Sequence, residues 1–370
     1  MMTVLEKMTM TLHPNEDITK ILLSTPSYFT GEYEKDDFLL SIAFDNSSRY
    51  DPLGQEYFIL AVKTPPLDKS RVAIPDYSGT GDLLSIYLSI LYGKRFDNHG
   101  LVESLGLFRL PNYLPLGNYS LTLPFNSREP RPDLEIPLSL HEIRRIAPLL
   151  HEEQLDPRFE HFLISAGRFY LHSLQHAETQ PEIAFLDLIT CGEILSYFFD
   201  YDQDDLLDSE IKRDLTRIEN EIDGGDAIVR RLRNRLFNVK RRFVRTILYL
   251  LNPCFFLQSE AKENHGRLNQ NDISMRIKAA YDLRSRYVHT GVNFGVWIDP
   301  QRGGRFNNEI QLGKPVIEDS DLKRILIRSP TFIGMEGIMR FCLLRFMHLN
   351  GIFIDLRLEE KGLTMLEMDN

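Results

Sequence analysis

The spacing of the apolar residues changes once along this chain, and that change constrains the fold more than any other feature. Up to about residue 140, short apolar runs alternate with turn signals, as the strands of an antiparallel sheet do. After the Pro-rich segment SREPRPD, the apolar residues recur with the period of about 3.6 that is typical of helices. The sequence therefore predicts an α+β fold, in which an antiparallel β-rich domain (residues 1–140) precedes an all-α bundle (residues 141–370).

Five runs in the first part have strand character: DFLLSIAFD, EYFILAVKTP, RVAIPDY, NYSLTLPF and LEIPLSL. One helix interrupts them at residues 82–92, with Gly79, Gly81 and Asp82 as its start signal and Gly93 as its stop. In the second part, helices are expected at residues 141–150, 157–178, 181–199, 206–221, 228–250, 274–289 and 319–349. The last of these contains a break near Ser329 and Pro330.

Composition narrows the class of protein. The chain has 370 residues, 43% of them hydrophobic, and a net charge of -10, which argues against coating nucleic acid over the whole surface. Cys191, Cys254 and Cys342 lack the spacing of a disulfide framework or a zinc site. No long apolar segment occurs, so we expect no membrane partner. Together with the cysteine pattern, this predicts a cytoplasmic protein, and we expect neither a metal nor a cofactor.

Two histidines have a spacing that metal ligands use. His172 and His176 have the i, i+4 spacing of such ligands on a helix. No carboxylate completes an HExxH arrangement around them, so we expect both to face solvent.

The segment AAYDLRSRYVHTG places Arg284, Ser285, Arg286 and His289 near the end of an expected helix that Gly291 terminates. Arginine is permanently charged and matches a phosphate, while histidine exchanges protons near neutral pH. Together they suit RNA cleavage by internal attack, in which a base takes the proton of a ribose 2′-OH and an acid protonates the departing 5′ oxygen. Cations that stabilise the phosphoryl charge make a metal unnecessary.

The spacing of Arg284 and His289 imposes a geometric condition, because residues five apart on a regular helix lie roughly 140° from each other. The two side chains can share one phosphate if the last turn unwinds toward Gly291, or if two copies of the helix in a homodimer build the site between them. The same spacing also fits a simpler role, in which the histidine caps the helix and the arginine is solvated.

YDLRSRYVHTG resembles the signature of HEPN domains, specifically that of the ApeA-like branch. Residues 166–199 resemble the first two helices of that branch, and residues 229–251 resemble the helix before the signature helix. The similarity covers roughly residues 155–350, about half of the chain. It implies a helical domain that dimerises and cuts RNA without a metal, in phage defence or stress response.

The resemblance also implies roles for single residues. Arg284 would stabilise the scissile phosphate, His289 would transfer protons, and Ser285 would occupy the polar position after the arginine. Glu193 matches an acidic position that commonly faces the Arg-His pair and would orient one of the two. Ser285 departs from the Asn, Asp or His of many HEPN nucleases, although serine is typical of the ApeA-like branch.

Further basic residues are candidate RNA contacts. Arg286 is either a phosphate ligand or a solvated arginine on the helix face. Residues 230–245 form a basic segment in which Arg241, Arg242 and Arg245 are expected to contact RNA. Acidic residues precede this segment, so its pairing with them is the alternative.

Two functions follow from these patterns. The first is an endoribonuclease that a protein or ligand trigger activates through the N-terminal domain. The second is a HEPN-like module that binds RNA or a protein partner without cutting.

Overall fold

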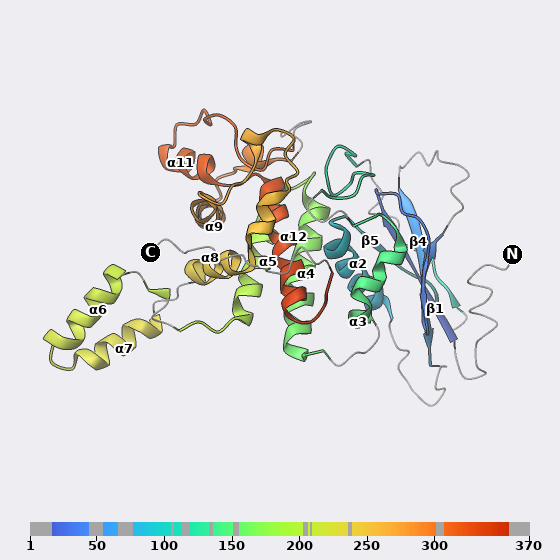
Figure 1. Ribbon diagram of the computed structural model, residues 1–370, viewed down its shortest axis with the longest axis horizontal. Coiled ribbons are helices and arrows are strands. Elements are labelled where there is room, and N and C mark those ends of the chain that lie inside the picture. The colour runs from blue at the N-terminus through green and yellow to red at the C-terminus, as the bar shows by residue number, and fades with distance from the viewer. Residues whose placement is uncertain are drawn as a thin grey trace.

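The computed structural model describes residues 17–43, 55–65, 77–104, 107–112, 119–132, 136–150, 155–202, 206–207, 209–235, 239–300 and 307–354. Figure 1 shows a twisted sheet at one end of the molecule, helices at the other, and α2 between them. The sheet has six strands in the order β2-β3-β4-β1-β5-β6, and every pairing is antiparallel. The predicted α+β class, with an antiparallel sheet before a mostly helical region, is confirmed.

The strands are β1 (Asp17–Thr25), β2 (Tyr33–Lys35), β3 (Phe38–Ile42), β4 (Glu56–Thr64), β5 (Asp97–Ser104) and β6 (Leu107–Phe108). The runs DFLLSIAFD and EYFILAVKTP form β3 and β4 as expected. The central strand β1 and its neighbour β5 were not expected. β5 has the polar sequence DNHGLVES, and buried partners hold it in the sheet: His99 Nε2 lies 2.7 Å from Ser24 Oγ, and Arg95 pairs with Asp97 at 2.9 Å.

Two other strand predictions were wrong. In NYSLTLPF, the described residues, from 119 onward, form turns rather than a strand. The carbonyl of Pro124, at the end of this run, accepts a hydrogen bond from Nζ of Lys94 at 2.7 Å, as do the carbonyls of Ser127 and Glu129 just after the run at 3.0 and 2.7 Å. Carbonyls that meet at one side chain do not alternate sides as those of a strand do. The described part of LEIPLSL, from residue 136, is a loop with a single bridge between Ser139 and Thr30. RVAIPDY lies outside the described residues, apart from Tyr77.

Helix α2 (Ser78–Tyr92) joins the sheet to the helical part (Figure 1). It begins four residues before the expected start and ends at Gly93, which has a φ of +62°. Most of its residues are buried, because the sheet packs on one side and α4 (Pro157–His176) on the other. Gly167 permits this close approach, since a Cβ there would lie 2.6 Å from Ile86 Cγ2.

The remaining helices are α3 (Ala147–Leu150), α5 (Pro181–Phe198), α6 (Ser209–Glu221), α7 (Gly225–Arg235), α8 (Val239–Leu250), α9 (Ile273–Thr290), α10 (Gly295–Ile298), α11 (Ser320–Arg328) and α12 (Phe332–Leu349). Two differences from the prediction are that the short helix α10 was not expected and that most of the expected helix 141–150 is a 3₁₀ helix, Leu140–Ile146. The expected helix 228–250 corresponds to α7 and α8, and the residues between these two helices lie outside the described ones. The expected break near Ser329 and Pro330 separates α11 from α12.

A buried ionic network connects the two parts of the chain. The guanidinium of Arg131 donates to both carboxylate oxygens of Glu336 at 3.1 and 2.6 Å, and to the carbonyl of Gly93 at 2.9 Å. Tyr170 of α4 donates to the same carboxylate at 2.5 Å, and Glu260 also pairs with Arg131. The hydrophobic core likewise runs without interruption from the strands into α12. The division near residue 140 stays a prediction about the sequence, because the two parts share this core.

Candidate functional site

Helix α9 carries the candidate catalytic residues. Ile273, Ile277, Ala280 and Leu283 recur at helical spacing and are buried, which fixes one side of the helix against the core. Gly291, with a φ of +66°, ends the helix and donates from its N–H to the carbonyl of Tyr287 at 2.8 Å. His289 therefore lies within the helix, and the last turn does not unwind before it.

Arg284 lies against α5. Its Nη2 donates to Oε2 of Glu193 at 3.3 Å, so the structure brings this predicted pair together. The Nε of Arg284 is buried and has no hydrogen-bond partner in the described part of the chain. Burial and a hydrogen bond to Glu193 raise the pKa of Tyr281, one turn earlier on α9, to about 12. Glu193 thus contacts both an arginine with a spare donor and a neutral tyrosine.

His289 lies on a different side of α9 from Arg284. Because the helix is continuous over both positions, their side chains lie roughly 140° apart. The side chain of His289 is exposed and forms no hydrogen bond or ion pair with any residue that the structure describes. Ser285 is half-buried and precedes it by four residues, which places the two on one face. Within one chain, Arg284 is therefore paired with Glu193, whereas Ser285 and His289 only share a face of the helix.

A cationic groove of about 630 Å³ lies between α8, α9 and α11. Its charged lining is Lys240, Lys278, Asp282, Arg324 and Arg328. Lys240 pairs with Asp282 at 2.5 Å, whereas Lys278 and Arg328 are exposed and form no ion pair among the described residues. Lys278, Asp282, Ser285 and His289 share one face of α9 by helical spacing, so this face runs from the groove to His289.

Arg286 is engaged in a structural contact. It pairs with Asp319, whose other carboxylate oxygen accepts from the N–H groups of Asp321 and Leu322 at the start of α11. This partly buried ion pair, which attaches α9 to α11, matches neither the phosphate ligand nor the solvated arginine expected from the sequence. A phosphate ligand there would have to compete with Asp319.

The arginines of α8 contact the segment that follows α5. Arg241 and Arg242 donate to the carbonyl oxygens of Leu206 and Phe199 at 2.7 and 3.3 Å. The guanidinium groups of Arg242 and Arg245 lie 5.9 and 5.2 Å from the ring centre of Tyr201. Leu206 belongs to the acidic stretch that precedes the basic segment, so one of these contacts reaches that stretch through a main-chain carbonyl. Three of its aspartates lie outside the described residues, so pairing with this stretch and contact with RNA both stay predictions.

His172 and His176 on α4 are only partly exposed, although the side chain of His176 keeps 39% of its surface exposed. The rings of His172 and His176 lie 6.0 Å apart, and His176 Nδ1 lies 3.4 Å from Asp187 Oδ2. Within the described ranges, no three His, Cys, Asp or Glu side chains gather as metal ligands would. The described helices also include none that is long and apolar enough to cross a membrane.

Comparisons of the chain with protein-family models, with curated proteins and with solved structures found no match. The likeness to HEPN domains therefore depends on the residues quoted from the sequence.

Sequence reasoning missed the cations of the groove. Lys278 stands directly before the segment AAYDLRSRYVHTG, and Arg324 and Arg328 belong to α11, which begins thirty residues after the end of α9. The spacing of Arg324 and Arg328, four residues apart on an amphipathic helix, was the available signal. It does not reveal that their helix packs beside α9, which only the tertiary structure decides.

Proposed function

We propose that this protein is an endoribonuclease of the HEPN type, which cleaves RNA by attack of the 2′-OH without a metal. It acts in the cytoplasm, in phage defence or stress response. The observation that carries the proposal is the position of His289. It shares a face of α9 with Lys278 and Asp282, which line the cationic groove, so an RNA strand bound in the groove passes beside the imidazole.

The chemistry assigns one task to each side chain. His289 accepts the proton of the ribose 2′-OH, the 2′ oxygen forms a bond to phosphorus, and the bond from phosphorus to the 5′ oxygen breaks. An imidazolium, from the second copy in a dimer, gives a proton to the departing 5′ oxygen. The products are a 2′,3′-cyclic phosphate and a 5′-hydroxyl end. Arg284, with its free Nε, stabilises the charge on the phosphoryl oxygens.

A homodimer completes the site in this proposal. Arg284 and His289 of one chain lie on different faces of α9, so a second α9 is required to bring an arginine and a histidine to one phosphate. Val288 and Val292, which are 52% and 38% exposed, flank His289 and offer apolar surface for such a contact. A symmetric contact there would bring the two His289 side chains together. Arg284, which pairs with Glu193 on another face of α9, would have to turn toward this contact to reach the same phosphate.

The direct test is cleavage of a labelled RNA by the purified full chain in the presence of EDTA, beside Arg284→Ala and His289→Ala. We expect losses of about 10²–10³-fold and 10²–10⁴-fold in rate. Arg213→Ala, an exposed arginine on α6, is the matched control and should keep full activity. Cleavage that requires a metal, or that survives both active-site substitutions, would refute the mechanism.

The second candidate is a module that binds RNA without cutting it. The ion pair of Arg284 with Glu193 favours this function, because it holds the arginine away from His289 within one chain. Retained RNA binding with no product, in a protein that sedimentation shows to be a monomer, would support this alternative.

A further inference from the structure

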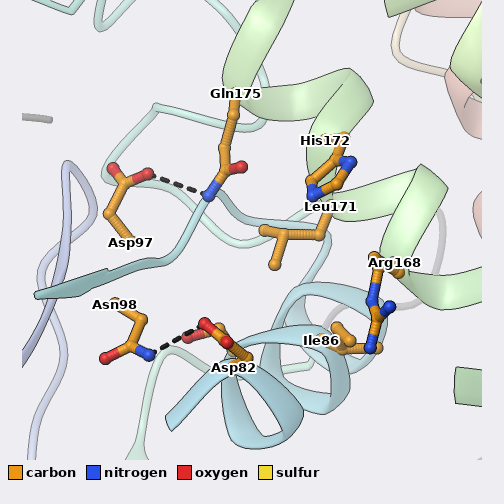
Figure 2. A pocket seen from close by; sticks show the side chains of 9 residues that line it. Asp82, Ile86, Asp97, Asn98, Arg168, Leu171, His172 and Gln175 are labelled. Carbon is orange, nitrogen blue, oxygen red and sulfur yellow. Dashed lines mark hydrogen bonds between the residues drawn. The ribbon is translucent and has the colours of Figure 1, made fainter. Parts of the chain in front are cut away.

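A second cleft lies where the strand-bearing part meets the helices. It has a volume of about 420 Å³ and is formed by the first half of α2, the start of β5 and the second half of α4. Figure 2 shows the side chains of Arg168 and His172 entering from α4, opposite Asp82 of α2 and Asn98 of β5. The cleft is separate from the groove beside α9 and does not depend on the proposed nuclease.

Some charged side chains of this cleft have a partner of opposite charge among the described residues, and others do not. Asp97 is neutralised by Arg95 at 2.9 Å, and it accepts a hydrogen bond from Gln175 at 3.0 Å (Figure 2). Arg168 is exposed and forms no ion pair with any described residue, while Asp82 is exposed and accepts from the neutral amide of Asn98 at 2.8 Å. The cleft thus offers one cation and one carboxylate that no opposite charge neutralises.

Ser85 supplies a second, independent sign of a ligand. Its side chain is 1% exposed and lines the cleft, yet its Oγ has no hydrogen-bond partner in the described part of the chain. A buried hydroxyl without a partner is destabilising, so such groups usually belong to a site that a ligand or water completes. Ile86 and Leu171 add apolar surface beside it.

We propose that this cleft binds a small zwitterion of the amino-acid type. Its carboxylate would pair with Arg168, its ammonium group with Asp82, and its apolar part would contact Ile86 and Leu171. The hydroxyl of Ser85 would complete its hydrogen bonds from the buried end of the cleft. Opposite charges on one ligand satisfy both uncompensated side chains at once, which a simple anion or cation does not.

A ligand in this cleft would contact both parts of the chain, because α2 and β5 form one wall and α4 of the helical part forms the other. A zwitterion held between α2 and α4 links two elements that otherwise meet through apolar packing. Helix α4 packs directly on α5, which carries Glu193. Ligand binding between α2 and α4 therefore stabilises the contact between the two parts of the chain.

The experiment is a thermal-unfolding screen of the full chain with each of the twenty common free amino acids at millimolar concentration, followed by calorimetry on those that raise the melting temperature. The N-acetyl and the amide derivatives of the same compound are the chemical controls, because each lacks one of the two charges. We expect binding of at least one free amino acid, and binding at least about tenfold weaker for both derivatives.

Arg168→Ala and Asp82→Asn should each weaken binding at least about tenfold, and Ser85→Ala about fivefold. Ser89→Ala is the matched control, because Ser89 is also a buried serine of α2 whose Oγ has no partner among the described residues, but it does not line the cleft. The proposal is overturned if no amino acid binds, if an N-acetyl derivative binds as tightly as the free compound, or if Ser89→Ala weakens binding as much as Ser85→Ala.

Discussion

At the scale of single residues, Glu193 is the side chain whose role can be tested most sharply. It accepts from Arg284 and also contacts Tyr281. We expect Glu193→Gln to lower the pKa of Tyr281 from about 12 toward its ordinary value, because the hydrogen bond to a carboxylate and its charge are removed. A spectrophotometric titration of tyrosine ionisation measures this change.

In the cleavage assay, Glu193→Gln should lower the cleavage rate and leave the affinity for RNA unchanged, because Glu193 positions Arg284 and does not bind RNA itself. An unchanged cleavage rate would contradict that role.

His172 provides a test of pH dependence. Burial lowers the pKa of His172, and the nearby His176 and Arg168 lower it further, against the opposing effect of Asp187 and Asp82. As the pH falls below about 6.5, the unfolded chain takes up this proton before the folded protein does, so the contribution of His172 to stability declines. An NMR titration of labelled histidine should place its midpoint below 6.5. A midpoint at or above that value would show that the opposing carboxylates dominate.

At the scale of elements, the groove between α9 and α11 predicts where RNA binds. Lys278 and Arg328 are its exposed cations without an ion pair among the described residues. We expect Lys278→Ala with Arg328→Ala to weaken RNA binding and to reduce the slope of log affinity against log salt by about 1.4, since each phosphate contact to a single strand contributes about 0.7. The control is Lys212→Ala with Arg213→Ala on α6, which removes the same charge. Equal effects of the two pairs would indicate that only net charge matters.

At the scale of the whole molecule, the buried network around Glu336 holds the strand-bearing and helical parts together. Glu336→Gln removes the charge of one carboxylate from the guanidinium of Arg131, which is 1% exposed and also pairs with Glu260. We expect a loss of roughly 3 kcal/mol in the free energy of unfolding, because breaking one ion pair of a buried network is strongly destabilising. Urea unfolding monitored by circular dichroism measures it. Glu221→Gln, in an exposed pair with Arg217, should change stability by less than about 0.5 kcal/mol.

The same whole-molecule contacts explain which strands could be predicted. β3 and β4 were predictable because their apolar residues are continuous and flanked by turn signals. β5 was not, because its polar side chains are matched by partners from distant segments, such as Ser24 for His99. NYSLTLPF has the alternation of a strand, but its described residues form turns, and the carbonyl of Pro124 at its end accepts from the buried ammonium group of Lys94. Local periodicity therefore fails where a buried polar group determines the path of the chain.

Local spacing and the turn at Gly291 were enough to predict the order of the two parts, the positions of most helices and the segment that contains Arg284 and His289. The contact of Glu193 with Arg284, the two arginines that α11 brings beside α9, and the charged cleft between α2 and α4 could not be predicted in this way. Such contacts join residues far apart in the chain. They arise from how buried helix faces pack together, which no local pattern encodes.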